Sequence, residues 1–491
     1  MLGLKRLNQN PLKIRHQRKN QRISKKLNRE TNSSGLFPGV IEKTSPSKGC
    51  DAQLKRVAVM TLGCKLNQYD SEMVLAQFRA AGCETVENAS DADLCIVNTC
   101  SVTTTAERKV RNTLRSVYRK NPKAKILVIG CTAERTPETL SGFPGVIGIV
   151  GNAEKEHILE IIKRYAESKT PVIEVGGVSQ SVKWTDQVRL DGLLGRTRSF
   201  LKVQDGCSQF CTYCIVPKLR GRGRSQPISE AVDHASYLID KGFKEIVLTG
   251  CALGTYGFDF EMSDGLTRLL VALDKIPGSH RIRLGSVEPW AVTADFLRVI
   301  ADSERICPHL HIPLQSCDDS VLRRMNRRYR VADIREILDS AFRLREDWGF
   351  GSDIIVGFPG ETDEQFENTR AFLYDSRISY LHVFPFSSRP GTAATKLPGF
   401  IESGLKQNRV KQLAALDAEL RKRFYERHLG KSCRVLFENR YVNGLLAGHA
   451  DNYLDVYIVP SPGLIGKHVE VKIEKLSTDG VEGALHEREE P

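Results

Sequence analysis

Three cysteines in one short segment have the spacing of an iron–sulfur ligand set. Cys207, Cys211 and Cys214 lie in the sequence GCSQFCTYC, spaced C-x3-C-x2-C. Three thiolates can hold three irons of a [4Fe–4S] cluster, whereas a cluster held by cysteine alone uses four. A structural zinc site is the alternative, but zinc takes four ligands, usually in paired cysteine units, and no fourth Cys or His lies nearby in the sequence. The spacing therefore favours a cluster with one iron left open for another ligand.

Three more cysteines each follow a short apolar run. Cys64 ends VAVMTLGC, Cys100 ends LCIVNTC and Cys131 ends ILVIGC. If the runs are parallel strands, their C-terminal ends share one edge of a sheet, and the sequence predicts a second three-thiolate site there. The alternative is that these are ordinary small buried cysteines, which is our interpretation of Cys83 and Cys95.

The composition bounds the class of protein. A hydrophobic share of 41% and a charged share of 27% are typical of a soluble globular protein. No apolar run approaches the ~20 residues that span a bilayer, and the N-terminus lacks the apolar segment of a secretory signal. We therefore expect a soluble, cytoplasmic protein without a membrane partner, and in a reducing compartment 13 cysteines indicate ligands rather than disulfides.

The formal net charge of +13 indicates a polyanionic partner. Part of it lies in residues 1–54, which we expect to be a basic disordered extension; contact with RNA and an organelle transit peptide are the alternatives. Two further segments are candidates for an RNA surface, although such runs are often only solvated faces. Their basic residues are Arg220, Arg222 and Arg224, and then Arg323, Arg324, Arg327, Arg328 and Arg330.

The elements that position the cysteines can be read from the apolar periodicity. Strands alternating with helices from residue 55 to 166 predict a Rossmann-like parallel sheet domain. After a linker at 167–196, a second alternation over 197–427 predicts a barrel-like or open α/β unit with its chemistry at the strand ends. Alternating runs over 428–488 predict a small antiparallel β-barrel. The predicted strands are 56–61, 94–98, 125–130, 146–151, 200–203, 245–249, 281–284, 310–313, 352–356 and 381–384, and the main predicted helices are 69–81, 104–120, 155–164 and 405–428.

Four phrases together resemble a known family. TLGCKLNQYDSE, VNTCSVT, IGC and CSQFCTYCIVPKLRGRGRS are similar to those of the radical S-adenosylmethionine (SAM) methylthiotransferases, and the resemblance covers nearly all of residues 56–485. It implies an N-terminal domain with an auxiliary [4Fe–4S] cluster, a central partial (β/α)6 radical SAM barrel with a second cluster, and a C-terminal TRAM β-barrel that binds RNA. It also implies that SAM occupies the open iron beside Cys207, Cys211 and Cys214.

The resemblance further implies the reaction. The family replaces the C2–H of an adenine by a methylthio group, and because that hydrogen is not acidic the cofactors must supply a radical. An electron splits SAM, the resulting radical takes the hydrogen, and the cluster on Cys64, Cys100 and Cys131 delivers sulfur methylated by a second SAM. An external electron donor such as a flavodoxin or ferredoxin is implied.

Candidate cofactor residues also come from the resemblance. Tyr213 stands at the aromatic position before the third cysteine. Gly250 lies in the loop LTGCALGTYG near the methionine end of SAM, and the other polar or glycine positions expected to face SAM or substrate are Ser286, Glu288, Gln315, Gly357 and Gly360. Two positions depart from the family pattern: Cys251 stands where an aliphatic residue is usual, and Cys317 where glycine is usual.

The substrate is indicated by the residues after the first cysteine. Lys65, Asn67 and Gln68 match the branch that acts on threonylcarbamoyladenosine in tRNA, whereas the isopentenyladenosine branch tends to have Gln-Met-Asn and the branch that modifies a ribosomal-protein aspartate Pro-Lys-Asn. We therefore expect methylthiolation of threonylcarbamoyladenosine. A different class, an RNA-binding redox sensor whose clusters are not catalytic, stays open.

Overall fold

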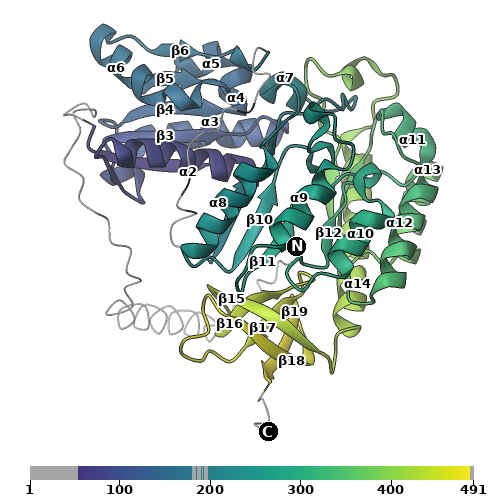
Figure 1. Ribbon diagram of the computed structural model, residues 1–491. Helices are drawn as coiled ribbons and strands as arrows, with labels where there is room; N and C mark the ends of the chain where they lie inside the picture. Colours follow the sequence, from purple (N-terminus) through teal and green to yellow (C-terminus); the bar gives the residue numbers. More distant parts are fainter. Residues whose placement is uncertain (1–53, 180–183, 185–189, 191, 193–196, 487–491) are drawn as a thin grey trace, which may run out of the picture. The chain divides into compact units, whose positions relative to one another are not determined.

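The N-terminal domain is a parallel sheet with helices on both faces. The computed structural model describes residues 54–179, 184, 190, 192 and 197–486, so the predicted basic extension lies outside the described residues except for Leu54. Six strands form one sheet in the order β2-β1-β3-β4-β5-β6, and all its pairs are parallel (Figure 1). The elements are β1 (Arg56–Thr61), α2 (Lys65–Ala80), β2 (Glu84–Thr85), β3 (Leu94–Thr99), α3 (Thr104–Lys120), β4 (Lys125–Gly130), α4 (Cys131–Arg135), α5 (Pro137–Ser141), β5 (Val146–Val150), α6 (Ile158–Ser168) and β6 (Val172–Glu174).

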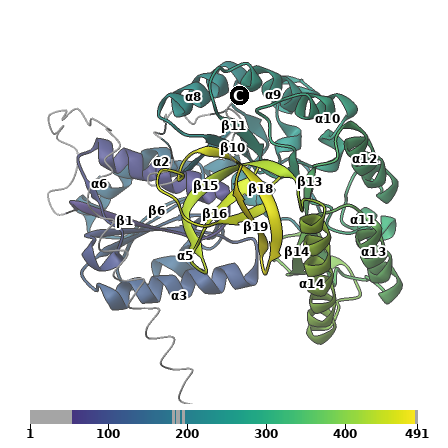
Figure 2. The same cartoon turned by 90° about the horizontal axis from the view of Figure 1, so that it is seen from below.

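Burial explains why this sheet forms. Strands β3 and β5 are buried along their whole length and are rich in Ile and Val, as expected of a parallel sheet covered on both faces. Helices α2 and α6 supply the apolar side chains of one face, and α3 and α5 supply those of the other (Figure 2). Helix α3 begins where predicted because the Thr103 hydroxyl accepts a hydrogen bond from the backbone of Ala106.

The sheet extends beyond the boundary that the sequence pattern indicated. Strand β6 lies inside the predicted linker 167–196 and pairs with β5. Helix α2 also begins earlier than predicted, at Lys65 rather than Tyr69, with Cys64 as its N-cap. The apolar pattern did not predict this part of the helix, because its buried residues include the polar Asn67 and Asp70. These two side chains are buried in polar contacts with Arg220.

The central unit is a half-open ring of six parallel strands. Two three-stranded sheets, β11-β10-β7 and β12-β13-β14, are joined by isolated parallel bridges, among them Ile282 to Ile306. The elements are β7 (Arg198–Lys202), β8 (Gln204–Asp205), α7 (Val216–Arg220), β9 (Arg224–Ser225), α8 (Ile228–Asp240), β10 (Glu245–Thr249), α9 (Gly265–Asp274), β11 (Arg281–Leu284), α10 (Ala294–Ala301), β12 (His309–His311), α11 (Asp319–Arg324), α12 (Val331–Leu344), β13 (Gly349–Val356), α13 (Asp363–Asp375) and β14 (Tyr380–Pro385). Helices α8 to α13 follow one another along the outside of the strands (Figure 2), which confirms the predicted partial (β/α)6 barrel.

The C-terminal part consists of a long helix and a closed five-stranded barrel. The barrel order is β15-β16-β17-β19-β18. Its elements are α14 (Ser403–Glu426), β15 (Ser432–Val442), β16 (Leu445–Ala450), β17 (Asp455–Ile458), β18 (His468–Ser477) and β19 (Gly480–Leu485). The predicted barrel is confirmed, but its antiparallel character is incomplete: β17 and β19 pair in parallel, because β18 carries the chain across before β19 returns beside β17.

No helix in the described ranges combines the length and the apolar character needed to cross a bilayer.

Candidate active site

The first cysteine set lies in a loop that two short strands hold at its base. Strands β8 and β9 pair antiparallel, and the loop between them carries all three cysteines. Gly206 begins this loop with φ of 69°, and a Cβ there would lie 2.0 Å from the carbonyl oxygen of Arg222, so only glycine fits. The backbone N–H of Cys207 donates to Gly221 and that of Cys214 to Cys211, each at 3.0 Å. These bonds stabilise the backbone of the loop.

The three thiols of this loop lie close enough to interact with one another. Burial raises the pKa of Cys207 to about 11 and that of Cys214 to about 12, and the charge of Cys211 raises both further. None of the three forms a disulfide. Because a ligand thiolate needs a compensating positive charge in such surroundings, three converging thiols with raised pKa values fit a cationic cluster. Arg327 adds one cation, with Nη1 3.4 Å from Sγ of Cys211.

Loops from later strand ends pack against the first cysteine set. The Tyr213 ring meets Phe358 edge-on, with ring centroids 6.5 Å apart. Phe358 follows Gly357, which has φ of 72° and donates from its backbone to Oε2 of Glu361 at 2.6 Å. Gly360 has φ of 76°. The structure therefore places Tyr213 against the loop that carries Gly357 and Gly360. Their contact with SAM stays a prediction.

The remaining candidate cofactor residues lie on the same edge. Gly250 follows β10, and a Cβ there would approach Oε1 of Gln204 to 2.9 Å. The Glu288 carboxylate accepts a hydrogen bond from the backbone of Gly254 at 2.9 Å, and burial raises its pKa. Glu288 therefore shapes the turn after Gly250 in addition to any contact with a ligand.

Two polar residues form isolated β-bridges just after the ends of β11 and β12. Ser286, which is exposed, bridges to His311, and Gln315 bridges to Ile354. Gln315 has a left-handed φ of 67°, an uncommon conformation for a residue with a side chain. Strained backbone at a strand end is typical of ligand sites.

The second cysteine set forms at the edge of the N-terminal sheet, as the strand pattern predicted. Cys64 precedes α2, Cys100 follows β3 and Cys131 opens α4 directly after β4. A Cβ on Gly63 would lie 2.8 Å from Cβ of Cys100, so a glycine lets the first two strand ends approach. Burial raises the pKa of Cys100 to about 11, and the charges of Cys131 and Cys64 raise it further. None of the three is in a disulfide, and the donor set fits a second cluster with three cysteine ligands.

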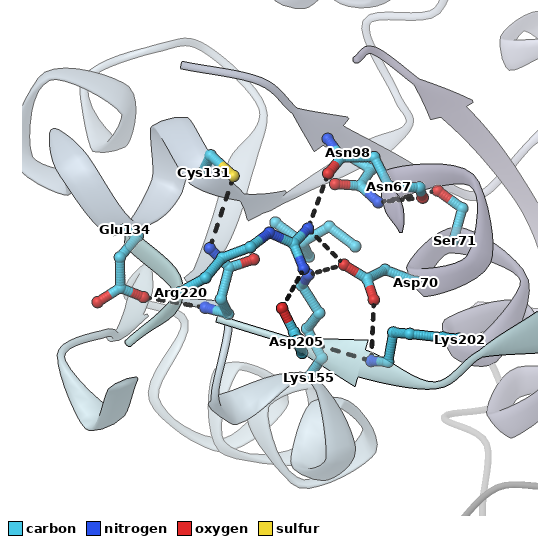
Figure 3. A network of polar contacts seen from close by, with 12 residues as sticks. Asn67, Asp70, Ser71, Asn98, Cys131, Glu134, Lys155, Lys202, Asp205 and Arg220 are labelled. Carbon is cyan, nitrogen blue, oxygen red and sulfur yellow. Dashed lines mark hydrogen bonds and ion pairs between the residues drawn. The ribbon is translucent and has the colours of Figure 1, made fainter. Parts of the chain in front are cut away.

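Arg220 links the two cysteine-bearing domains. It lies in α7, just after the first cysteine set, yet its guanidinium reaches Oδ2 of Asp70 in α2 at 2.8 Å and Oδ1 of Asp205 in β8 at 3.1 Å (Figure 3). It also donates to Oδ1 of Asn67 at 2.9 Å. Arg220 is only 3% exposed. The prediction that Arg220 contacts RNA is therefore wrong, because its guanidinium is buried and forms ion pairs with two buried carboxylates.

Two lysines complete this network around Asp70. Lys155 lies 2.6 Å and Lys202 3.5 Å from the carboxylate (Figure 3). Burial opposes the charge, but Lys155, Arg220 and Lys202 together hold the pKa of Asp70 well below its usual range. Sequence reasoning missed Asp70 and both lysines. The available signal was the helical spacing of Asn67 and Asp70 on one face of α2.

The other arginines that were predicted to bind RNA fall into a buried or partly buried group and an exposed group. Arg224 is buried and bonds Asp205 at 3.3 Å, so its prediction is also wrong, whereas Arg222 is exposed. Arg327 is likewise not a solvated residue: its guanidinium lies over the rings of Trp290 and Tyr329, at 5.3 and 5.0 Å from the centroids. The second predicted segment keeps three exposed residues, Arg323, Arg328 and Arg330, while Arg324 is half-buried.

The cysteines that depart from the family pattern have defined partners. Cys251 lies beside the network, with Sγ 3.4 Å from Oδ1 of Asp205, so it is more than a small apolar side chain. Cys317 is buried, and its backbone donates to the hydroxyl of Thr369. Cys95 is a buried free cysteine of the N-terminal core, as expected. Cys83 is also buried there but forms a disulfide, so the interpretation of Cys83 as an ordinary free cysteine is wrong.

Comparisons with known proteins agree with this architecture. Residues 56–151 match the model of the Uncharacterized protein family UPF0004, and residues 201–373 match that of the Radical SAM superfamily. The chain is 38% identical over 427 residues to the threonylcarbamoyladenosine tRNA methylthiotransferase MtaB of Bacillus subtilis, covering 85% of this chain and 94% of that protein. It is 36% identical to the MtaB of Thermotoga maritima, covering 87% and 96%. A tRNA-2-methylthio-N(6)-dimethylallyladenosine synthase of Aquifex aeolicus is 32% identical, covering 88% and 99%.

Solved structures support the fold alone. The radical SAM methyltransferase TsrM from Kitasatospora setae, with cobalamin and a [4Fe–4S] cluster bound, superimposes with a TM-score of 0.52 at 13% identity, covering 80% of each chain.

Proposed function

The chain belongs to the tRNA methylthiotransferase family of radical SAM enzymes, and we propose that it adds a methylthio group to C2 of threonylcarbamoyladenosine in tRNA. The relatives with the higher identities bear that activity in their names. The observation that carries the proposal is the pair of three-cysteine sets at strand ends of two domains joined by Arg220. A redox sensor has no need of a SAM-type barrel between its cysteines and its RNA-binding domain.

The radical SAM domain implies SAM and a [4Fe–4S] cluster, and we propose Cys207, Cys211 and Cys214 as its ligands. We propose Cys64, Cys100 and Cys131 as the ligands of a second [4Fe–4S] cluster. When bound, these groups supply a radical that can break the strong C2–H bond and the sulfur that replaces the hydrogen. The protein's part is to hold both ligand sets and the adenine in a fixed relation.

Several side chains serve that positioning. Arg220 fixes helix α2, and with it Cys64, against strand β8 at the base of the first cysteine loop. Arg327 ties Cys211 to the segment that follows β12 by donating to the carbonyl oxygen of Pro313 at 2.9 Å. Glu288 holds the turn at Gly254. We propose that Tyr213, Gly250, Ser286, Glu288, Gln315, Gly357 and Gly360 line the SAM side of the site.

The substrate and the electron donor approach from the surface. An adenine modified at C2 must leave its stack, which is easiest in an anticodon loop. We propose that exposed Arg222, together with Arg323, Arg328 and Arg330, contacts tRNA phosphate, which makes binding depend steeply on salt. The barrel β15–β19 is consistent with a TRAM domain that adds RNA affinity. A small one-electron donor such as a flavodoxin or ferredoxin supplies the electron.

Mass spectrometry of tRNA nucleosides tests the proposal. A strain lacking the gene should lose 2-methylthio-threonylcarbamoyladenosine, and wild-type protein should restore it while Cys64→Ala and Cys207→Ala should not. Loss of the methylthio-isopentenyl nucleoside instead would correct the substrate and keep the chemistry. No change in either nucleoside would refute a tRNA substrate, and the ribosomal-protein aspartate would be measured next.

A further inference from the structure

A chain of polar side chains crosses the inner face of strands β12, β13 and β14, apart from the cysteines. In the pairing of β13 with β14, Asp353 lies opposite His382. In the pairing of β12 with β13, His311 lies opposite Gly351, which is two residues before Asp353. Oδ1 of Asp353 lies 3.0 Å from Nε2 of His311 and 3.3 Å from Nδ1 of His382. One carboxylate oxygen thus accepts hydrogen bonds from two imidazoles on the flanking strands.

These side chains face the interior of the half-barrel. Side chains alternate along a strand, and Leu310, Ile354 and Leu381 belong to the apolar core under the outer helices. Their neighbours therefore point the opposite way. In a filled barrel such residues are packed by other side chains, but here the His382 side chain is 51% exposed and Phe384, two residues on, is 45% exposed. The inner face of β14 is open to a ligand.

The same face adjoins the candidate SAM residues. Ser286 bridges to His311, and Gln315 donates from its backbone to the carbonyl oxygen of Asp353 at 2.7 Å. His311 and Asp353 thus lie one strand position from two residues that we assign to the cofactor side. A nucleoside whose C2 meets the SAM side would extend its substituent along this face.

Lys65 is the first residue of α2, and it is exposed. Its charge is disfavoured by Arg198 on β7 and Arg283 on β11 and favoured by Glu245 on β10. It also acts on His309 on β12, so the ammonium lies within electrostatic range of the barrel strands. Glu245 is already paired with Arg281 at 2.5 Å and with Arg283 at 3.1 Å. Among the residues that the structure describes, no carboxylate forms an ion pair with Lys65, so this cation is free to meet an anionic ligand.

The polar groups on this face suit a threonylcarbamoyl substituent rather than a dimethylallyl one. A threonylcarbamoyl group carries a carboxylate, a hydroxyl and a ureido unit, whereas a dimethylallyl group carries no polar atom. Because the Asp353 carboxylate only accepts, Nδ1 of His382 carries the hydrogen that faces it. Nε2 of His382 has no partner within the described residues and points away from Asp353.

Resting on the proposed function, we propose that the His311–Asp353–His382 chain is the subsite for the threonyl end of the substrate, with His382 bonding its polar atoms and Lys65 facing its carboxylate. Asp353 and His311 are positioning residues that orient His382. The subsite would explain selection of a charged substituent over an apolar one, since an apolar group would leave His382 and Lys65 without partners in the complex.

The test compares anticodon stem-loop RNAs in equilibrium binding without reductant and in steady-state turnover. The RNAs carry threonylcarbamoyladenosine, its carboxylate methyl ester, or unmodified adenosine. Loss of a hydrogen bond to a charged group weakens binding roughly tenfold to a hundredfold. We expect His382→Gln and Lys65→Met to raise the Kd and KM of the threonylcarbamoyl RNA by about that much with kcat little changed. Lys65→Met should leave the ester unaffected, and neither variant should alter binding of the unmodified RNA.

Controls separate this subsite from a structural role and from the function itself. His157→Gln, at an exposed histidine of the N-terminal domain, should match wild type, and iron content should be unchanged in every variant. Equal weakening for all three RNAs, or loss of iron, would overturn the subsite. Stoichiometric zinc or manganese in wild type that His382→Gln loses would overturn it too, since His311, Asp353 and His382 could also ligate an ion. If wild type modifies none of the RNAs, the proposed function fails, whereas normal turnover by His382→Gln refutes only the subsite.

Discussion

Replacing Arg220 by methionine removes the closer of two cations that Asp70 and Asp205 share across the two cysteine-bearing domains. Both carboxylates are buried, at 1% and 5% exposure. Arg220 contacts both at about 3 Å, and Lys202 lies 3.5 and 3.6 Å from them. Removing one partner of a buried ion pair costs about 3–5 kcal/mol, because a charge is left without compensation.

The remaining partners place the expected cost at the lower end of that range. Asp70 keeps Lys155 at 2.6 Å, Asp205 keeps Arg224 at 3.3 Å, and both keep Lys202. We therefore expect Arg220→Met to lower the free energy of unfolding by about 3 kcal/mol. The double variant Arg220→Met/Asp70→Asn should lose less than the sum of the two single variants, because the second change removes a carboxylate that the first left unpaired.

Urea unfolding of anaerobically purified protein, followed by circular dichroism, measures both quantities. Arg222→Met is the matched control, since Arg222 is exposed two residues away and its loss should change stability by less than about 0.5 kcal/mol. An Arg220→Met variant as stable as this control would refute the linking role. Strict additivity in the double variant would refute the coupling between Arg220 and Asp70.

Three further predictions follow from the same geometry. The pKa of Asp70 is held below the value of about 3.9 that an unfolded chain shows, so its charge stabilises the fold fully above that pH and progressively less as pH falls below it. Between pH 8 and pH 3, the urea concentration at the unfolding midpoint should fall more steeply for wild type than for Asp70→Asn, mainly at the acid end. The same pH dependence in both proteins would contradict this. Cys64→Ala and Cys207→Ala should each lower iron from about eight to about four atoms per chain, and a variant that retains full iron would remove that cysteine from the ligand set. Gly357→Ala should destabilise the protein by about 1–2 kcal/mol and weaken SAM binding, because φ is 72° and a Cβ would lie 2.2 Å from Cγ of Lys406; unchanged calorimetric SAM affinity would argue against a role for that loop.

Much of the fold was predictable because its signals are local. The strands 56–61, 125–130, 245–249 and 281–284 and the helix 104–120 have the predicted bounds. Each is an apolar run or an amphipathic period closed by a cap or a glycine, and such patterns do not depend on distant residues. The boundary errors at Lys65 and β6 arose where burial involves polar side chains or where a short strand gains its stability from a neighbour.

The arginines after the first cysteine set show where local reasoning failed. Arg220, Arg222 and Arg224 alternate with glycine and look equivalent in the sequence, yet only Arg222 reaches solvent. The other two are buried because Asp205, from the strand before the loop, and Asp70, 150 residues away, converge on them. The net positive charge pointed to RNA, but it carried no information on which cations were already paired.

The sequence by itself determined the cysteine sets, the strand ends on which they stand and the order of the domains, because residue spacing and hydrophobic period are written along the chain. The tertiary structure alone decided the partners of buried charge. The Arg220 network and the inner-face chain of His311, Asp353 and His382 each join residues from separate elements, and the register that aligns Asp353 with His382 exists only once β13 and β14 pair. Electrostatic contacts fall off over a few ångströms of space, and spatial distance is the quantity that a linear sequence does not contain.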